Sequence, residues 1–130
     1  MKTLLLIKPN VTKKNKIGAV LKIIESANFK IKELKTFKMT QLIAQEFYQE
    51  HIGKPFFESL VEFMTSEKIV AAILEKENAV KELRNVVGNT NPEKADYGTV
   101  RKIFGENVQE NAVHASDSKK SAKREISIIF

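Results

Sequence analysis

An uninterrupted apolar run, Ile69 to Leu74, lies near the middle of the chain. A run of this length is typical of a strand in the interior of a sheet that is covered on at least one face. A second apolar run, Thr3 to Ile7, ends at Lys8-Pro9, and we interpret it as a buried first strand. The fold prediction therefore starts from a sheet that contains both strands.

Apolar residues recur at helical spacing in four segments between and after these strands, which predicts four amphipathic helices. The four segments are Ile17–Ile24, Thr40–Tyr48, Pro55–Met64 and Asn78–Val87. Thr40 and Asn78 are predicted N-caps, Pro55 suits a first helical turn, and Gly88 suits a C-terminal cap.

A further strand is predicted from Phe29 onwards, after Asn28, which suits a left-handed helix end. Its apolar alternation changes phase between Ile31 and Leu34, and a β-bulge would explain the change.

The pattern weakens between Asn89 and Asn111, where we predict only one short helix, Thr99–Phe104. A loop region of this length in a compact domain is usually functional. A short strand then leads to His114, and a helix is predicted over Lys119–Glu125, capped by Asp117 or Ser118. This order places His114 beside a helix N-terminus, where free N–H groups attract anions.

The predicted order is strand, helix, strand, helices, strand, helix, loop, strand, helix. It corresponds to a βαββαβ pattern, the ferredoxin-like arrangement, with helices on one face of a four-stranded antiparallel sheet. The sequence has no internal repeat and no linker, so residues 1–130 are expected to form one domain.

Composition narrows the possible functions. The sequence has no cysteine and only two histidines, His51 and His114, so a structural zinc site is not expected. No segment approaches the roughly 18 apolar residues of a membrane span, which makes a cytoplasmic protein the default expectation. The net charge of +6 favours anionic partners, either nucleotides or nucleic acid, although a solvated lysine-rich surface would give the same charge.

The five glycines match neither a P-loop nor a dinucleotide fingerprint, and the protein-kinase signatures are absent. Ser116 lies near His114, but no nucleophile elbow supports a hydrolase triad. Arg84, Thr90 and Arg101 offer two cations and a hydroxyl, and guanidinium groups suit phosphate oxygens. Each of these residues is also compatible with a purely structural role, and His51 is expected to be structural.

Six short segments, taken together and in order, resemble the nucleoside diphosphate kinase family. They are Lys8-Pro9, Tyr48–Phe57, Gly88–Pro92, Gly98–Arg101, Asn111–Ser118 and Ser121–Ile126. The resemblance implies an enzyme that transfers the γ-phosphoryl group from ATP to a nucleoside diphosphate, in ping-pong fashion, through a phosphohistidine at His114.

The resemblance also implies roles for the other site residues. Tyr48, Ser116 and Glu125 would support the histidine, and Glu125 would orient its ring. The remaining members of the site would bind the nucleotide: Arg84, Thr90 and Arg101 its phosphates, Lys8 its sugar hydroxyl and the transferred phosphate, Asn111 its ribose, and Phe56 and Val108 its base. Contacts of this kind read no base edge, so broad base tolerance is expected.

Mg²⁺ is expected to arrive on the nucleotide phosphates, so no protein metal ligand is assigned. The resemblance implies a homo-oligomer, either tetramer or hexamer, without a membrane or dedicated nucleic-acid site. Alternative interpretations are a ferredoxin-like nucleic-acid-binding module and a catalytically inactive regulatory relative. Ala115, Asn10 and Tyr97 depart from the usual glycine, acid and proline of the family, and strain at Ala115 is expected if its φ is positive.

Overall fold

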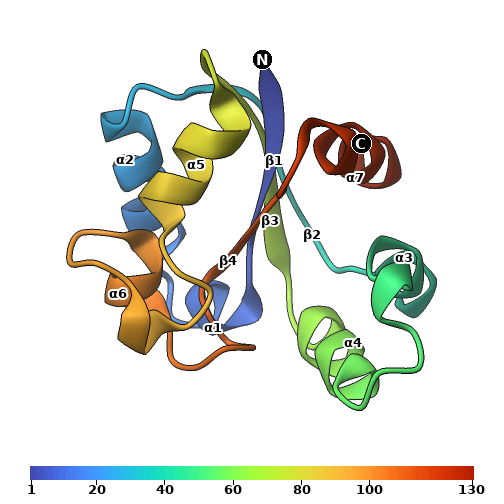
Figure 1. Cartoon of the computed structure of the whole chain (residues 1–130). Coiled ribbons are helices and arrows are strands. Elements are labelled where there is room, and N and C mark those ends of the chain that lie inside the picture. Colours follow the sequence, from blue (N-terminus) through green and yellow to red (C-terminus); the bar gives the residue numbers. More distant parts are fainter.

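The computed structural model describes residues 1–130, and Figure 1 shows a central sheet with helices on both sides. In chain order the elements are β1 (Lys2–Ile7), α1 (Pro9–Thr12), α2 (Ile17–Ser26), β2 (Lys30–Phe37), α3 (Gln41–Phe47), η1 (Gln49–His51), α4 (Phe57–Thr65), β3 (Ile69–Glu75), α5 (Ala79–Val87), η2 (Pro92–Lys94), α6 (Val100–Phe104), β4 (Val113–Ala115) and α7 (Lys119–Ile129).

The sheet has the strand order β2-β3-β1-β4, and every neighbouring pair is antiparallel. The two apolar runs, β1 and β3, are the two central strands, as the sequence predicted. The pairing of β2 with β3 shifts register between Ile31 and Glu33, which confirms the predicted bulge. The ferredoxin-like arrangement is therefore confirmed.

The prediction that helices cover one face of the sheet is wrong. Leu5 and Ile7 of β1 belong to one buried cluster, which includes residues of α2 and α5. Leu4 and Leu6 belong to a second cluster, which includes residues of α3, α4 and α7. Because both sets of alternating β1 side chains are apolar, both sheet faces need a covering layer. Figure 1 shows these layers on opposite sides of the sheet.

Several helix ends match the sequence prediction. The Thr40 hydroxyl accepts a hydrogen bond from the backbone N–H of Ile43 and caps α3, as predicted. The short helix predicted from Thr99 is α6, and the Thr99 hydroxyl caps it by accepting from the N–H of Lys102. Ser118, one of the two predicted candidates, caps α7 by accepting from the N–H of Ser121. These caps satisfy N–H groups that have no partner within the helix.

Other ends differ from the prediction. Pro55 lies in a turn two residues before α4 rather than in its first helical turn. Asn78 precedes α5 but has a left-handed backbone, φ 57°, and its side chain makes no cap bond. The last helix continues to Ile129, beyond the predicted end at Glu125, because Ile129 packs into the core. None of the helices combines the length and apolar character that crossing a bilayer would require.

Candidate active site

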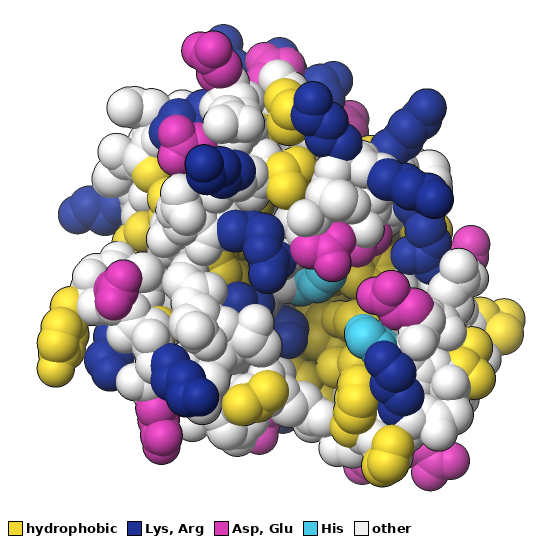
Figure 2. Space-filling model, viewed as in Figure 1, with side chains coloured by type: hydrophobic (Ala, Val, Ile, Leu, Met, Phe, Trp, Pro, Cys, Tyr) yellow, Lys and Arg dark blue, Asp and Glu magenta, His cyan; other side chains and the backbone are white.

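The predicted site residues meet at one cavity of about 620 Å³. Figure 2 shows a hollow near the centre of this face, with the two histidines in it, cationic side chains to the left and hydrophobic side chains to the right. Ten of the predicted residues line the cavity: Lys8, Tyr48, Phe56, Arg84, Thr90, Arg101, Val108, Asn111, His114 and Glu125. The eleventh, Ser116, is fully buried and contacts Glu125.

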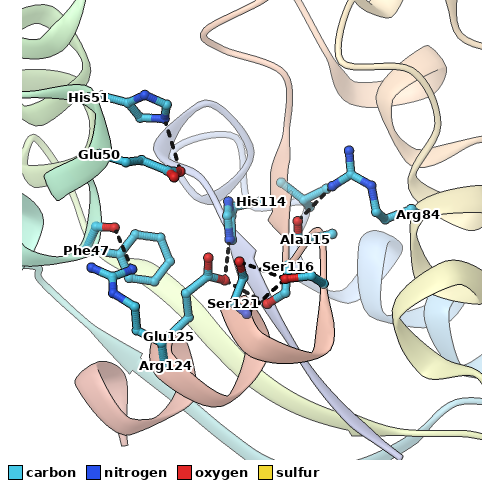
Figure 3. Close-up of polar contacts among 12 residues, drawn as sticks. Phe47, Glu50, His51, Arg84, His114, Ala115, Ser116, Ser121, Arg124 and Glu125 are labelled. Atoms are coloured by element: carbon cyan, nitrogen blue, oxygen red, sulfur yellow. Dashed lines mark hydrogen bonds and ion pairs between the residues drawn. The ribbon is translucent and has the colours of Figure 1, made fainter. Parts of the chain in front are cut away.

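His114 is held by the sheet and by the last helix. It lies in β4 and pairs with Leu6 of β1, so its backbone position is fixed. Its Nε2 lies 2.8 Å from Oε1 of Glu125, which comes from α7 (Figure 3). Since an ionised carboxylate only accepts hydrogen bonds, Nε2 carries the proton in this pair. Nδ1 then keeps its lone pair, and no hydrogen bond occupies it.

Two further contacts fix this arrangement. Ser116 donates a hydrogen bond of 2.7 Å to the same Oε1 atom that receives His114. On the other side of the imidazole, the ring of Phe47 meets it edge-on, with centroids 5.0 Å apart. Arg124 of α7 donates to the backbone oxygens of Phe47 and Glu46. The polar partner of the His114 ring is therefore the Glu125 side chain. The backbone N–H of Ser121, in the first turn of α7, donates its hydrogen bond to the Ser118 hydroxyl.

Two guanidinium groups lie at the cavity without an acidic partner. Arg101 is only 6% exposed and donates to the backbone oxygens of Gly88 (3.1 Å) and Val113 (3.0 Å). Arg84 extends from α5 and donates to the backbone oxygen of Ala115 at 3.0 Å (Figure 3). Burial, together with the charge of Arg84, lowers the pKa of Arg101 to about 10, so Arg101 stays cationic at neutral pH. Uncompensated cations of this kind favour an anionic ligand.

A short chain of hydrogen bonds connects Lys8 to the long loop. Lys8 Nζ donates to Asn111 Oδ1 at 2.9 Å and to the backbone oxygen of Gln109 at 3.2 Å. Asn111 Nδ2 donates to the backbone oxygen of Thr90 at 3.0 Å. Burial, together with the charge of Arg101, lowers the pKa of Lys8 to about 7. The lysine at the end of β1 is thus poised to gain a proton when an anion binds beside it.

The other part of the cavity is aromatic and aliphatic. Phe56 and Val108 border it and remain 45% and 58% exposed. The Tyr48 hydroxyl is buried without a hydrogen-bond partner, and burial together with Glu125 raises the pKa of this phenol. His51 was expected to be structural, yet it lines the cavity and lies 5.3 Å from the Phe56 ring.

Sequence reasoning did not assign four other lining residues, Glu50, Leu60, Gln109 and Asp117. Asp117 follows the His114 segment directly, so its proximity to the site could have been found. The other three carry no local signal, because only the approach of separate segments brings them to the cavity.

The family model described as nucleoside diphosphate kinase matches residues 1–130. The chain belongs to the nucleoside diphosphate kinase family. A relative from Haemophilus ducreyi with that name is 51% identical over 98% of this chain and 93% of its own length. One from Persephonella marina is 46% identical over 99% of this chain and 92% of its own.

Solved structures of the family agree with this assignment. The Aquifex aeolicus nucleoside diphosphate kinase has a TM-score of 0.96 and 43% identity, covering 99% of this chain and 94% of that one. The Halobacterium salinarum enzyme, solved in complex with CDP, has a TM-score of 0.97 and 31% identity, covering 100% and 87%. The protein is therefore an enzyme that transfers phosphoryl groups between nucleotides. The family match favours this activity over the two alternatives, a nucleic-acid-binding module and an inactive relative.

The residues that depart from the family pattern cause little strain in the structure. Ala115 lies in β4 with extended backbone, so the strain expected there is absent. Ala112 instead adopts positive φ, 78°, at a cost on the order of 1 kcal/mol. Asn10 donates through Nδ2 to the backbone oxygens of Phe104 and Glu110 at 3.1 and 3.2 Å, which stabilises the loop. Tyr97 is 91% exposed and therefore does not contribute to the packing of the core.

No three histidine, aspartate or glutamate side chains lie close enough together to hold a metal ion. Glu125 is already occupied by His114 and Ser116. Glu50 and Asp117 line the cavity as separate carboxylates. A hard cation at this site would therefore take most of its oxygen ligands from a bound phosphate chain and from water.

Proposed function

We propose that His114 carries the phosphoryl group between nucleotides. Nδ1 attacks the γ-phosphorus of a nucleoside triphosphate, a nitrogen–phosphorus bond forms, and the bond to the β–γ bridging oxygen breaks. The nucleoside diphosphate leaves, and a terminal oxygen of a second nucleoside diphosphate then attacks the phosphohistidine and regenerates the imidazole. The observation that carries the proposal is the 2.8 Å contact of Nε2 with Glu125, which leaves Nδ1 as the free nucleophile in the cavity.

Glu125 would act throughout both half-reactions. When Nδ1 becomes phosphorylated, the ring keeps its Nε2 proton and gains positive charge, which the carboxylate stabilises. Ser116 holds the carboxylate oxygen in place through its 2.7 Å bond. Tyr48 offers a protonated phenol beside this pair, and its hydroxyl has no competing partner.

Arg84, Arg101 and Thr90 would hold the phosphates of the substrate. Positive charge aimed at the transferring group stabilises charge that develops during phosphoryl transfer. The absence of an acid at either guanidinium supports this role, since no internal ion pair has to break when substrate binds. Lys8 would contact the transferred phosphate and the sugar, and Asn111 would contact the ribose.

Phe56 and Val108 would enclose the base. Both side chains are exposed at the cavity, so a base placed between them would bury apolar surface. Apolar contact and stacking discriminate weakly between bases, which supports broad base tolerance. Mg²⁺ would be carried by the nucleotide phosphates and would neutralise part of their charge.

We further propose that residues 1–130 act as one domain within a cytoplasmic homo-oligomer, tetramer or hexamer. The two buried clusters on opposite faces of one sheet support the single domain.

Incubation with γ-labelled ATP tests the proposed function. The wild-type chain should retain an acid-labile label that added GDP or CDP removes. His114→Ala should retain no label, whereas His51→Ala, the matched control at the chain's other histidine, should still be labelled. Label that survives in His114→Ala would contradict the proposed nucleophile.

A further inference from the structure

The cavity has two borders that come from segments far apart in the sequence. Phe56 lies immediately before α4, and Val108 lies in the loop between α6 and β4. Because the two residues are far apart in the chain, only non-covalent contacts can fix the distance between them. Because a flat base would lie between them, their separation decides how closely the base is packed.

One hydrogen-bonded pair joins these two segments, Ser59 of α4 and Gln109 of the loop. The Ser59 Oγ lies 3.2 Å from both Oε1 and Nε2 of Gln109. No other hydrogen bond or ion pair connects residues 41–66 with residues 90–112. Ser59 lies three residues after Phe56, and Gln109 follows Val108 directly, so the pair joins the two borders beside the base-binding side chains.

Gln109 is also connected to the phosphate end of the cavity. Its backbone oxygen accepts from Lys8 Nζ at 3.2 Å, and its backbone N–H donates to Asn107 Oδ1 at 3.0 Å. Gln109 is therefore held at three points, by Ser59, Lys8 and Asn107. A residue held in this way sets the position of one border relative to both the other border and the cationic end.

We propose that the Ser59–Gln109 bridge sets the width of the base-binding slot, and that Gln109 is a positioning residue for the nucleotide. The inference rests on the proposed function, since it takes the base to lie between Phe56 and Val108. Neither bridge side chain makes a hydrogen bond to His114, so the bridge acts on nucleotide binding and not on the transfer step. Purine nucleotides, whose larger rings contact more of both borders, depend on the bridge more than pyrimidine nucleotides do.

The test compares four variants with wild type: Ser59→Ala, Gln109→Ala, the double variant, and Ser59→Thr, which keeps the hydroxyl. Calorimetry measures binding of ADP, CDP and inorganic diphosphate, and steady-state kinetics gives KM and kcat. A hydrogen bond of this class is worth about two- to tenfold in an equilibrium constant. Each alanine variant should raise Kd and KM for ADP by about that factor, and for CDP by less, with kcat unchanged.

Three comparisons separate positioning from a general loss of structure. The double variant should bind ADP no more weakly than either single variant, because both lose the same bridge. Ser59→Thr should bind as wild type does, and inorganic diphosphate, which has no base, should bind equally to all variants.

Alanine variants that bind ADP as tightly as wild type would overturn the proposal, as would additive losses or an equal loss for diphosphate. If wild type itself fails to bind nucleotides and to form phosphohistidine, the proposed function fails together with the bridge. If wild type does both and the variants match it, only the bridge fails.

Discussion

Replacing Glu125 by alanine should slow phosphorylation of His114 while the cavity keeps its cations. In the structure, Oε1 of Glu125 receives both His114 Nε2 (2.8 Å) and the Ser116 hydroxyl (2.7 Å). A hydrogen bond to a charged group contributes about 1.5–3 kcal/mol. Since about 1.4 kcal/mol corresponds to a tenfold rate change, the loss should be roughly tenfold to a hundredfold.

Two companion variants separate charge from geometry. Glu125→Gln keeps an oxygen that can accept from Nε2 but lacks the negative charge, so its rate should lie between wild type and Glu125→Ala. Ser116→Ala keeps the His114–Glu125 contact and removes only the bond that holds the carboxylate in place, so the loss should be smaller than that of Glu125→Ala.

The assay is single-turnover transfer from γ-labelled ATP, quenched in base to preserve the phosphohistidine. Circular dichroism and thermal unfolding verify that each variant is folded before its rate is compared. A folded Glu125→Ala protein that is phosphorylated within about twofold of the wild-type rate would refute the role given to this carboxylate.

Three further results are expected. At pH 8, above the lowered Lys8 pKa of about 7, ADP binding should take up nearly one proton, because the phosphates restore the ammonium charge. At pH 6 Lys8 is already protonated, so proton uptake by Lys8 should vanish. Calorimetry in buffers of different ionisation enthalpy measures the uptake, and a Lys8→Met variant with the same uptake would contradict this prediction. Arg84→Ala should lower the transfer rate by about tenfold or more with little change in Tm. Arg101→Ala should lower the transfer rate and the Tm, since buried Arg101 donates to two backbone oxygens. Equal Tm losses in the two variants would argue against this distinction. Ala115→Gly should destabilise the fold by about 0.5–1 kcal/mol in urea unfolding, because Ala115 is extended within β4, and a gain in stability would show that its backbone is strained.

Local sequence patterns predicted those parts of the fold that depend on neighbouring residues. The apolar runs became β1 and β3, Thr40 and Ser118 became caps, and the phase change in β2 became a bulge. Each of these features follows from side-chain periodicity or from one cap hydrogen bond, so a short window of sequence contains the necessary information.

Features that depend on tertiary packing were harder to predict. The helix layers on both sheet faces were missed, although the continuous apolar run from Leu4 to Ile7 already favours burial of β1 on both sides. The αL residue of the site segment is Ala112 and not Ala115, and no local sequence pattern identifies it.

The candidate site shows the same division. Spacing alone suggested an anion near His114 and cations at Arg84 and Arg101, but the family resemblance was needed to connect them. The contact of His114 with Glu125 joins a strand to a helix, and the periodicity of the sequence does not predict this contact. The Ser59–Gln109 bridge carries even less signal, since it depends on how two distant segments approach each other.

The proposed role of His114 is tested most directly by identifying which of its ring nitrogens carries phosphorus. Heteronuclear NMR of the phosphoenzyme, with ¹⁵N-labelled histidine, distinguishes Nδ1-phosphohistidine from Nε2-phosphohistidine through the coupling to ³¹P. Because Glu125 holds Nε2, phosphorus is expected on Nδ1. Phosphorus on Nε2, or on His51, would contradict it.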